Sequence, residues 1–260
     1  AVVRARVRTH LALKEARDRI EGISDKISKY VSPQIKQSII EGKQHAEIGS
    51  SRKKLTVFFS DIVGFTSQTD HMEPEDMTMI LNSYLDRMSV IALKYGGTVD
   101  KFIGDAILVF FGDPETKGVA QDALACVEMA LEMQMALEEL KEGWENAGIV
   151  TDFQIRVGIT SGYCTVGNFG SEERMDYTII GGQVNLASRL ETNASPSTIL
   201  ISEETYALVQ NTIECTPKEP IHVKGIGQSI QTYQVIGRKE HFGEDHSITD
   251  SRHGFSISLD

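Results

Sequence analysis

Apolar positions near the start of the chain repeat in a pattern that is typical of a helix. Spacings of three and four residues alternate at Leu13, Ala16, Ile20, Ile23, Ile27 and Tyr30. This spacing belongs to the seam of a coiled coil, and it also fits an amphipathic helix that packs on its own domain. We predict a helix that ends at Pro33, with both kinds of packing left open.

From Lys54 onward the pattern changes to strands that alternate with helices. The stretch "LTVFFSDIVGFT" predicts an apolar strand that stops at an acid and is followed by a glycine turn. The next helix has Pro74 in its first turn and ends at Gly96. Its apolar face follows helical spacing at Met77, Ile80, Leu81, Tyr84, Leu85, Met88 and Ile91.

The rest of the chain continues this mixture. "GGTVDKFIGDAILVFFGD" predicts two strands joined near Gly104 and Asp105, and a long helix follows from Val119 to Trp144. "FQIRVGITSGYCTVGNFG" predicts a second strand pair with a glycine-containing turn. Further strands are expected at "YTII", "STILIS", "IHVKGIG" and "IQTYQVIG", and helices at "QVNLASRLETNA" and residues 203–210. We therefore predict an α+β fold with helices packed on a largely antiparallel sheet.

Composition limits the kinds of partner. The chain has 26 basic and 37 acidic residues and a net charge of −11, which argues against a general affinity for nucleic acid or an anionic membrane. It lacks an apolar run near the roughly 20 residues of a transmembrane helix and any signal peptide at its start. Cys126, Cys164 and Cys215 lack metal-ligand spacing, which predicts reduced thiols in a cytoplasmic protein. Because there is no initiating Met, we expect a piece of a longer chain.

Two acids are candidates for chemistry because of their positions relative to apolar strands. Asp61 closes one such strand, and Asp105 lies at the turn of the predicted hairpin. If the sheet brings them together, two adjacent carboxylates repel unless a proton or a cation compensates. Oxygen ligands of this kind suit Mg²⁺ or Mn²⁺ that bridges to substrate phosphates. The alternative is that each acid only caps a turn.

Other polar residues could meet a phosphate. The turn in "DIVGFT" offers backbone N–H groups at the start of a helix. Asn185 and Arg189 share one face of a predicted helix, and Lys224 lies beside a glycine turn, although all three also suit an ordinary surface. Arg156 lies inside an apolar strand and needs an anionic partner. A Walker A loop, the kinase motifs and a dinucleotide fingerprint are missing, so a nucleotide would bind by another route.

Five motifs, taken together and in order, resemble the catalytic domain of the class III nucleotidyl cyclases. They are "VFFSDIVGFT", "GGTVDKFIGDAILVFFG", "IRVGITSG", "YTIIGGQVNLASRLE" and "HVKGIG", preceded by "KYVSPQI". The likeness is greatest to the cyanobacterial adenylyl cyclases that follow receiver domains. It implies a ferredoxin-like βαββαβ antiparallel sheet with helices packed on it. It also implies conversion of a nucleoside triphosphate into its 3′,5′-cyclic monophosphate by two divalent ions, Mg²⁺ or Mn²⁺, at sites shared by two catalytic domains.

The resemblance assigns roles to residues on both sides of such a shared site. The metal-bearing side comprises Asp61, Asp105 and the Ile62 carbonyl as metal ligands, Phe65 and Thr66 as a phosphate cradle, and Arg156 on a phosphate. The partner chain supplies Lys101 and Thr178 on the base, Asn185 on the ribose, Arg189 on the reacting phosphate and Lys224 on the terminal phosphates. Asp100 receives no role, and we expect it to pair locally with Lys101.

The nature of the base can be argued from the two side chains assigned to it. Adenine offers an acceptor at N1 and a donor at N6, which the ammonium of Lys101 and the hydroxyl of Thr178 complement. Guanine has the opposite polarity and would call for a carboxylate opposite N1. We therefore predict ATP as the substrate. Thr178 stands where many adenylyl cyclases carry Asp, which resembles the subgroup that responds to bicarbonate.

Two rival hypotheses remain. One is another enzyme, a guanylyl cyclase or a diguanylate cyclase, although "TVDKFIGD" lacks the acidic pair that follows the glycines in the latter. The other is an inactive cyclase-like domain that serves dimerisation or signal relay, although no required side chain is missing. Turnover of ATP and GTP separates these hypotheses.

The expected domain organisation follows from the same motifs. Residues 1–45 are predicted to be the end of a receiver domain and a linker helix, residues 46–237 the catalytic domain, and residues 238–260 a flexible tail. The expected partners are ATP, a second copy of the chain as a homodimer, and upstream receiver or sensor domains.

Overall fold

The computed structural model describes residues 2–27, 32–42, 47–171, 173–222, 229–239, 250–252 and 255–257. The chain divides into two compact units, Ala1–Glu47 and Ile48–Asp260. The first unit contains helix α1 (Val2–Ile27) and helix α2 (Pro33–Ile40). Pro33 does not end a helix but lies in the first turn of α2, where Ser32 Oγ accepts a hydrogen bond from Ile35 N. A proline fits this turn because its missing N–H would have no helical partner there.

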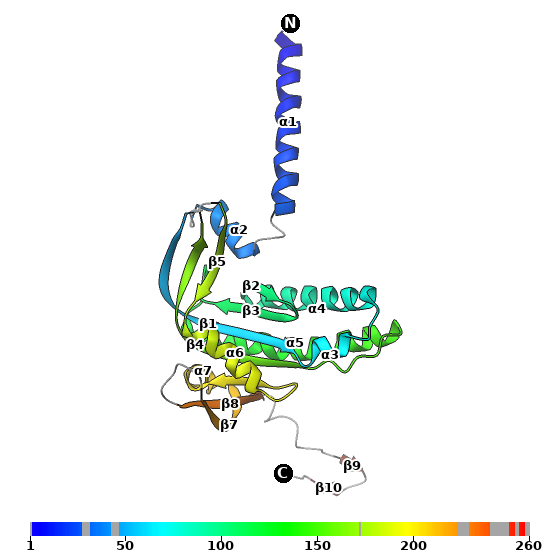
Figure 1. Cartoon of the computed structure of the whole chain (residues 1–260), viewed down its shortest axis with the longest axis vertical. Coiled ribbons are helices and arrows are strands. Elements are labelled where there is room, and N and C mark those ends of the chain that lie inside the picture. The colour runs from blue at the N-terminus through cyan, green and yellow to red at the C-terminus, as the bar shows by residue number, and fades with distance from the viewer. Residues whose placement is uncertain are drawn as a thin grey trace. The chain divides into compact units, whose positions relative to one another are not determined.

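One eight-stranded sheet forms the framework of the second unit (Figure 1). Its strands are β1 (Gly49–Ile62), β2 (Thr98–Ile103), β3 (Ala106–Phe111), β4 (Ile155–Gly170), β5 (Met175–Ile180), β6 (Ile199–Ser202), β7 (Ile213–His222) and β8 (Ser229–Arg238). They lie in the order β2-β3-β1-β4-β6-β8-β7, and β5 pairs with β4. The β4–β6 pair is parallel and the other pairs are antiparallel. The predicted α+β fold is confirmed, since the β4-β1-β3-β2 half of the sheet has the expected ferredoxin-like order.

Helices cover both faces of this sheet. They are α3 (Phe65–Thr69), α4 (Pro74–Tyr95), α5 (Val119–Asn146), α6 (Gly182–Asn193) and α7 (Glu203–Val209). Apolar side chains of α4, α5 and α7 share one core cluster with alternate residues of β1, β3 and β4, whereas Ala187 of α6 packs in a second cluster with the intervening residues. The two faces follow from the alternation of side chains along a strand.

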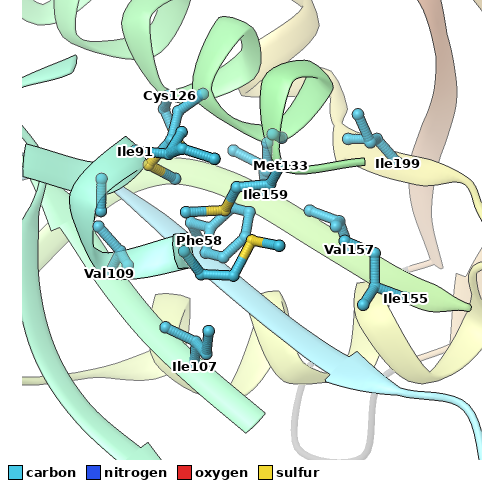
Figure 2. Packing of buried hydrophobic residues seen from close by; sticks show 14 of the residues in the cluster. Phe58, Ile91, Ile107, Val109, Cys126, Met133, Ile155, Val157, Ile159 and Ile199 are labelled. Atoms are coloured by element: carbon cyan, nitrogen blue, oxygen red, sulfur yellow. The ribbon is translucent and has the colours of Figure 1, made fainter. Parts of the chain in front are cut away.

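The larger core cluster fixes the position of the strands that carry the candidate site. Phe58 of β1, Ile107 and Val109 of β3, and Ile155 and Val157 of β4 point into it beneath the helices (Figure 2). Phe58, Val109 and Val157 are fully buried. Because β1 contributes Phe58 and Ile62 to this cluster and β4 contributes Ile155, Val157 and Ile159, a slip by one residue would remove these side chains from the core, so the register is strongly specified.

One predicted element is wrong. The segment expected to be a strand pair is the single 16-residue strand β4, which runs antiparallel to β1 from the Ile62–Ile155 pair to the Gly49–Asn168 pair. The glycines inside it do not form a turn, and at Gly158 and Gly167 the backbone of another segment approaches closely. A Cβ at Gly158 would lie 2.1 Å from the carbonyl oxygen of Ala187 in α6. Glycine in a strand interior has this alternative meaning.

The other predictions about single elements have mixed outcomes. The hairpin at Gly104 and the helices from Pro74 and Val119 are confirmed. The tail predicted at 238–260 lies mostly outside the described residues, of which Asp250–Arg252 (β9) and Phe255–Ile257 (β10) form an antiparallel pair. The three cysteines are unpaired. Among the described helices, none is long and apolar enough to cross a membrane.

Candidate active site

Asp61 lies one residue before the end of β1, on the edge where the strand leaves the sheet. Its partner across the β1–β4 ladder is Arg156, whose Nη2 is 3.8 Å from Asp61 Oδ2. On β1 the buried Phe58 and Ile62 face the larger core, so Asp61 faces the side of the sheet that α6 covers. The long antiparallel register thus places a carboxylate beside a guanidinium.

Asp105 reaches the same place from the hairpin between β2 and β3. Gly104 precedes it with a φ of 67°, a left-handed conformation that suits glycine in a two-residue turn. Asp105 Oδ2 accepts a hydrogen bond of 3.1 Å from the backbone N–H of Ile62, the residue after Asp61. The two acids that the sequence singled out are therefore neighbours.

The proximity of these carboxylates has an electrostatic consequence. Burial raises the pKa of Asp61 to about 7, and hydrogen bonding and repulsion from Asp105 contribute, while Arg156 opposes the shift. Repulsion between two adjacent carboxylates is relieved by a proton or a cation. The described residues contain no cluster of three or more His, Cys, Asp or Glu side chains suited to a metal ion. Two carboxylates with open positions fit Mg²⁺ or Mn²⁺, which retain waters and bind substrate phosphates.

Arg156 has a second acidic neighbour that the sequence did not reveal. Its Nε lies 2.9 Å from Oε1 of Glu191, whose side chain is only 4% exposed. Burial raises the pKa of Glu191 against the attraction of Arg156. The anionic partners of Arg156 in the structure are thus Glu191 and Asp61, and its predicted contact with a phosphate stays a prediction. The one signal for Glu191 was its position beside Leu190 and one turn after Ala187, on the apolar face of the predicted helix.

The predicted phosphate cradle is the turn into α3. Gly64 is the N-cap residue, and Phe65 and Thr66 begin the helix. The first N–H groups of a helix have no partner inside it, and the binding of a phosphate by these amides stays a prediction. The ring of Phe65 packs against Phe153, with 5.6 Å between the centroids, which fixes the turn on the core.

The two predicted base-recognition residues lie close together although they come from different strands. Lys101 is on β2 and Thr178 on β5, and both contact the buried Asp100. Thr178 Oγ1 donates a hydrogen bond of 2.6 Å to Asp100 Oδ2, and Lys101 Nζ lies 3.5 Å from Asp100 Oδ1. The expected local pairing of Asp100 with Lys101 is confirmed. The link to Thr178 was not foreseen, because it joins residues that are distant in sequence.

The remaining predicted residues lie on α6 or outside the described residues. Asn185 and Arg189 are both exposed on α6, whose buried side carries Leu186, Ala187 and Leu190. Their spacing of four residues gives them one common face. Lys224 falls outside the described residues. The predicted roles of Asn185 and Arg189 on a nucleotide stay predictions.

Comparisons with known proteins agree with this geometry. The sequence profile of the family described as adenylate and guanylate cyclase catalytic domain matches residues 49–237. A terminal-differentiation specific adenylate cyclase of Dictyostelium discoideum is 33% identical over 240 residues, which is 89% of this chain and 11% of that protein. The structure of the adenylyl cyclase CyaB from P. aeruginosa is 54% identical, has a TM-score of 0.71, and the match covers 73% of this chain and 96% of that one.

The similarity extends to enzymes with another substrate name. The structure of the guanylyl cyclase Cya2 is 34% identical, also has a TM-score of 0.71, and the match covers 75% of this chain and 98% of that one. The chain spans 11%, 33% and 44% of the length of three curated adenylate cyclases that it matches over most of its own length.

Proposed function

The chain belongs to the family of adenylate and guanylate cyclase catalytic domains, and from this premise we propose that it is an adenylyl cyclase. The proposed reaction converts ATP into 3′,5′-cyclic AMP and pyrophosphate. The observation that carries the proposal is the paired carboxylates of Asp61 and Asp105, which a hydrogen bond from Ile62 N holds together at the edge of the sheet. The identity of the base rests on Lys101 and Thr178.

Asp61, Asp105 and the carbonyl of Ile62 would hold two divalent ions, Mg²⁺ or Mn²⁺. When bound, such ions lower the pKa of a coordinated hydroxyl and neutralise charge on phosphate oxygens. The raised pKa of Asp61 supports this assignment, because a cation relieves the repulsion that contributes to it. The amides of Phe65 and Thr66 would orient the triphosphate beside the carboxylates.

The remaining residues would act on the nucleotide. Arg189 would stabilise negative charge on the reacting phosphate, and Asn185 would orient the ribose so that its 3′-hydroxyl is in line for attack. Arg156 and Lys224 would contact the phosphates. Because Arg156 is paired with Glu191 in the structure, this role requires it to exchange or share partners when the nucleotide binds.

Base recognition is the ground for preferring ATP over GTP. The Lys101 ammonium would donate to N1 of adenine, and Thr178 Oγ1 would lie opposite N6. Neither side chain is a carboxylate that could accept from N1–H of guanine. Family membership covers both substrates, so Lys101 and Thr178 are the support for proposing ATP.

We further propose that the active form is a head-to-tail homodimer with two shared sites. Phe102 and Ile103 are 45% and 54% exposed in β2, on the same hairpin as Lys101 and Asp105. An exposed apolar pair beside the site suits contact with a second copy. Asn185 and Arg189 are also exposed, as residues that act on the partner's substrate must be.

The proposed setting follows the organisation expected from the sequence. Residues 46–237 would be the catalytic domain, and residues 238–260 would be a tail. Residues 1–45 would be a linker that follows an upstream receiver or sensor domain, with a coiled coil as one form of its packing. We propose a cytoplasmic location, which the unpaired cysteines support. Thr178 is the basis for proposing stimulation by bicarbonate, which a bicarbonate titration of the purified enzyme would test.

The test is turnover by the purified chain. We expect cyclic AMP from ATP in the presence of Mg²⁺ or Mn²⁺, and its loss when a chelator removes the ion. A competition between ATP and GTP, with the cyclic products resolved by mass, should yield mainly cyclic AMP. Mainly cyclic GMP would favour the guanylyl cyclase hypothesis. A folded dimer without turnover in either ion would favour a relay domain.

A further inference from the structure

Asp100 connects the two residues that are proposed to recognise the base. Its Oδ1 lies 3.5 Å from Lys101 Nζ. Its Oδ2 accepts a hydrogen bond of 2.6 Å from Thr178 Oγ1 and a longer one of 3.4 Å from Ile179 N. One carboxylate thus joins β2 to β5 at the place where the base would bind.

The groups around Asp100 determine which protonation state of its side chain fits the site. The side chain is 1% exposed, whereas that of Lys101 is 43% exposed, so the carboxylate lies beneath the ammonium. One oxygen faces this ammonium and the other faces a backbone N–H, and both groups can only donate. A proton on either oxygen would point at a donor. The ionised carboxylate, which accepts from all three neighbours, is the form that satisfies them.

This arrangement determines the orientation of the Thr178 hydroxyl. A hydroxyl has one proton to donate and two lone pairs that accept. We propose that Asp100 is a positioning residue that sets base preference, because it engages the Thr178 proton and leaves Thr178 Oγ1 only an acceptor toward the nucleotide. The inference rests on the proposed adenylyl cyclase function. Lys101 is held at the same time, so a donor and an acceptor are presented side by side.

An oriented hydroxyl discriminates between purines in a way that a free one does not. Adenine carries an amino group at C6 and guanine a carbonyl, so an acceptor at Thr178 Oγ1 matches adenine and opposes the O6 lone pairs of guanine. A hydroxyl that is free to rotate could donate to O6 or accept from N6. Buried polar groups left without partners are what makes such a site reject the wrong ligand.

The first test is Asp100→Asn, which keeps the shape and removes the charge. The amide can turn its NH₂ group toward Thr178, whose hydroxyl then accepts from it and is free to donate to the nucleotide. We expect the ratio of kcat/KM for ATP to that for GTP to fall roughly 10- to 100-fold, the range for a hydrogen bond to a charged group. An equal loss for both nucleotides would show a merely structural role and would overturn the inference.

The matched control is Asp122→Asn. Asp122 is also a buried carboxylate that accepts from a threonine hydroxyl and a backbone N–H, those of Thr116 and Lys117, but it lies at the start of α5. We expect this variant to lose stability without a change in the ratio. A similar shift in both variants would mean that the ratio responds to general loosening of the fold, and this result also contradicts the inference.

A double variant tests whether Asp100 acts through Thr178. In a Thr178→Val background there is no hydroxyl to orient, so adding Asp100→Asn should change the ATP-to-GTP ratio by much less than it does alone. If the full shift persists without the hydroxyl, Asp100 does not act through Thr178 and the proposal fails.

A substrate analogue tests the acceptor role without any Asp100 variant, and so remains decisive if these variants do not fold. Purine riboside 5′-triphosphate lacks the N6 amino group. The wild-type chain should use it about tenfold less efficiently than ATP, and Thr178→Val should not distinguish the two. Equal use of both by the wild-type chain would overturn the inference while cyclic AMP formation still supports the proposed function. Turnover of neither ATP nor GTP would instead refute the proposed function itself.

Discussion

At the scale of single residues, the acids of the site and Arg156 have specific partners within the protein. Asp105 accepts from Ile62 N, and Arg156 lies between Asp61 and Glu191. Removing one member of a buried pair leaves the other uncompensated, which costs more than the pair contributes. The acids around Arg156 therefore act as one network, and a substitution of Glu191 should affect Asp61 as well.

The charge on Asp100 predicts a pH dependence of stability. Burial raises the pKa of Asp100, against the lowering effects of Thr178, Lys101 and Ile179 N. Between the unfolded value of about 3.9 and the raised folded value, the folded state binds more protons, so the unfolding free energy falls as pH rises through this window. The Asn side chain does not titrate. The unfolding free energy of the wild-type chain, relative to that of Asp100→Asn, should therefore decline with rising pH.

Urea unfolding of both proteins at a series of pH values measures this difference. It should be greatest near the lower end of the window and level off above it. A difference that grows with pH would mean that Lys101 and the hydrogen bonds outweigh burial, and that the pKa of Asp100 is lowered.

At the scale of elements, the site depends on how closely α6 approaches β4. Gly158 lies where a Cβ would be 2.1 Å from the carbonyl oxygen of Ala187 and 2.3 Å from the backbone N of Glu191. Both contacts are with helix backbone, which cannot rotate away as a side chain can. The absence of a side chain at residue 158 therefore sets the distance between the sheet and the helix that carries Asn185 and Arg189.

This close approach predicts a large effect of Gly158→Ala. The added methyl group must push α6 away from the sheet, and overpacking of this kind typically costs about 1–3 kcal/mol of unfolding free energy, occasionally more. We expect the upper end of this range in urea unfolding. The rate of cyclic AMP formation should fall by more than the loss of folded protein explains, because Asn185 and Arg189 move with α6.

The matched control is Gly143→Ala in α5, where nothing lies within 4 Å of an added Cβ. This substitution should raise the unfolding free energy by about 0.5–1 kcal/mol, since alanine is the better helix former. If both variants behave alike, the contact between Gly158 and α6 does not set the position of the helix.

At the scale of the whole molecule, one chain carries two sets of catalytic residues that we propose serve different active sites. Asp61 and Asp105 would hold the ions of one site. Asn185 and Arg189 lie on an exposed face of α6 and would complete the other. A closed two-fold dimer would contain two such sites, each built from both copies.

Mixing two inactive variants tests this arrangement. Asp61→Ala and Asn185→Ala should each abolish cyclic AMP formation, because every homodimer then has two defective sites. A heterodimer of the two has one intact site. Random assortment should restore about a quarter of wild-type activity, since half of the dimers are mixed and each has one of two sites.

The control for this mixture is Asp61→Ala combined with an Asp105→Ala chain. Both changes lie on the same side of the site, so a mixed dimer has no intact site and should stay inactive. Recovery in this control, or background activity in the first mixture although mixed dimers form, would contradict the shared-site proposal.

The sequence by itself determined the fold class and the identity of the candidate residues. The helix from Pro74, the hairpin at Gly104 and the acids Asp61 and Asp105 follow from local periodicity, turn residues and charges placed against apolar strands. Each of these signals is formed by residues that are close together in the sequence, so the sequence alone is enough to recognise it.

The tertiary structure alone decided which of these residues meet. The long register of β1 and β4 places Arg156 beside Asp61, and the packing of α6 on Gly158 brings Glu191 to Arg156. The bond from Thr178 to Asp100 joins two strands that are distant in the chain. Such contacts depend on strand order, register and helix packing, which no local pattern encodes. Hence the sequence predicted that Asp100 pairs locally with Lys101, and the fold showed that its carboxylate also binds Thr178.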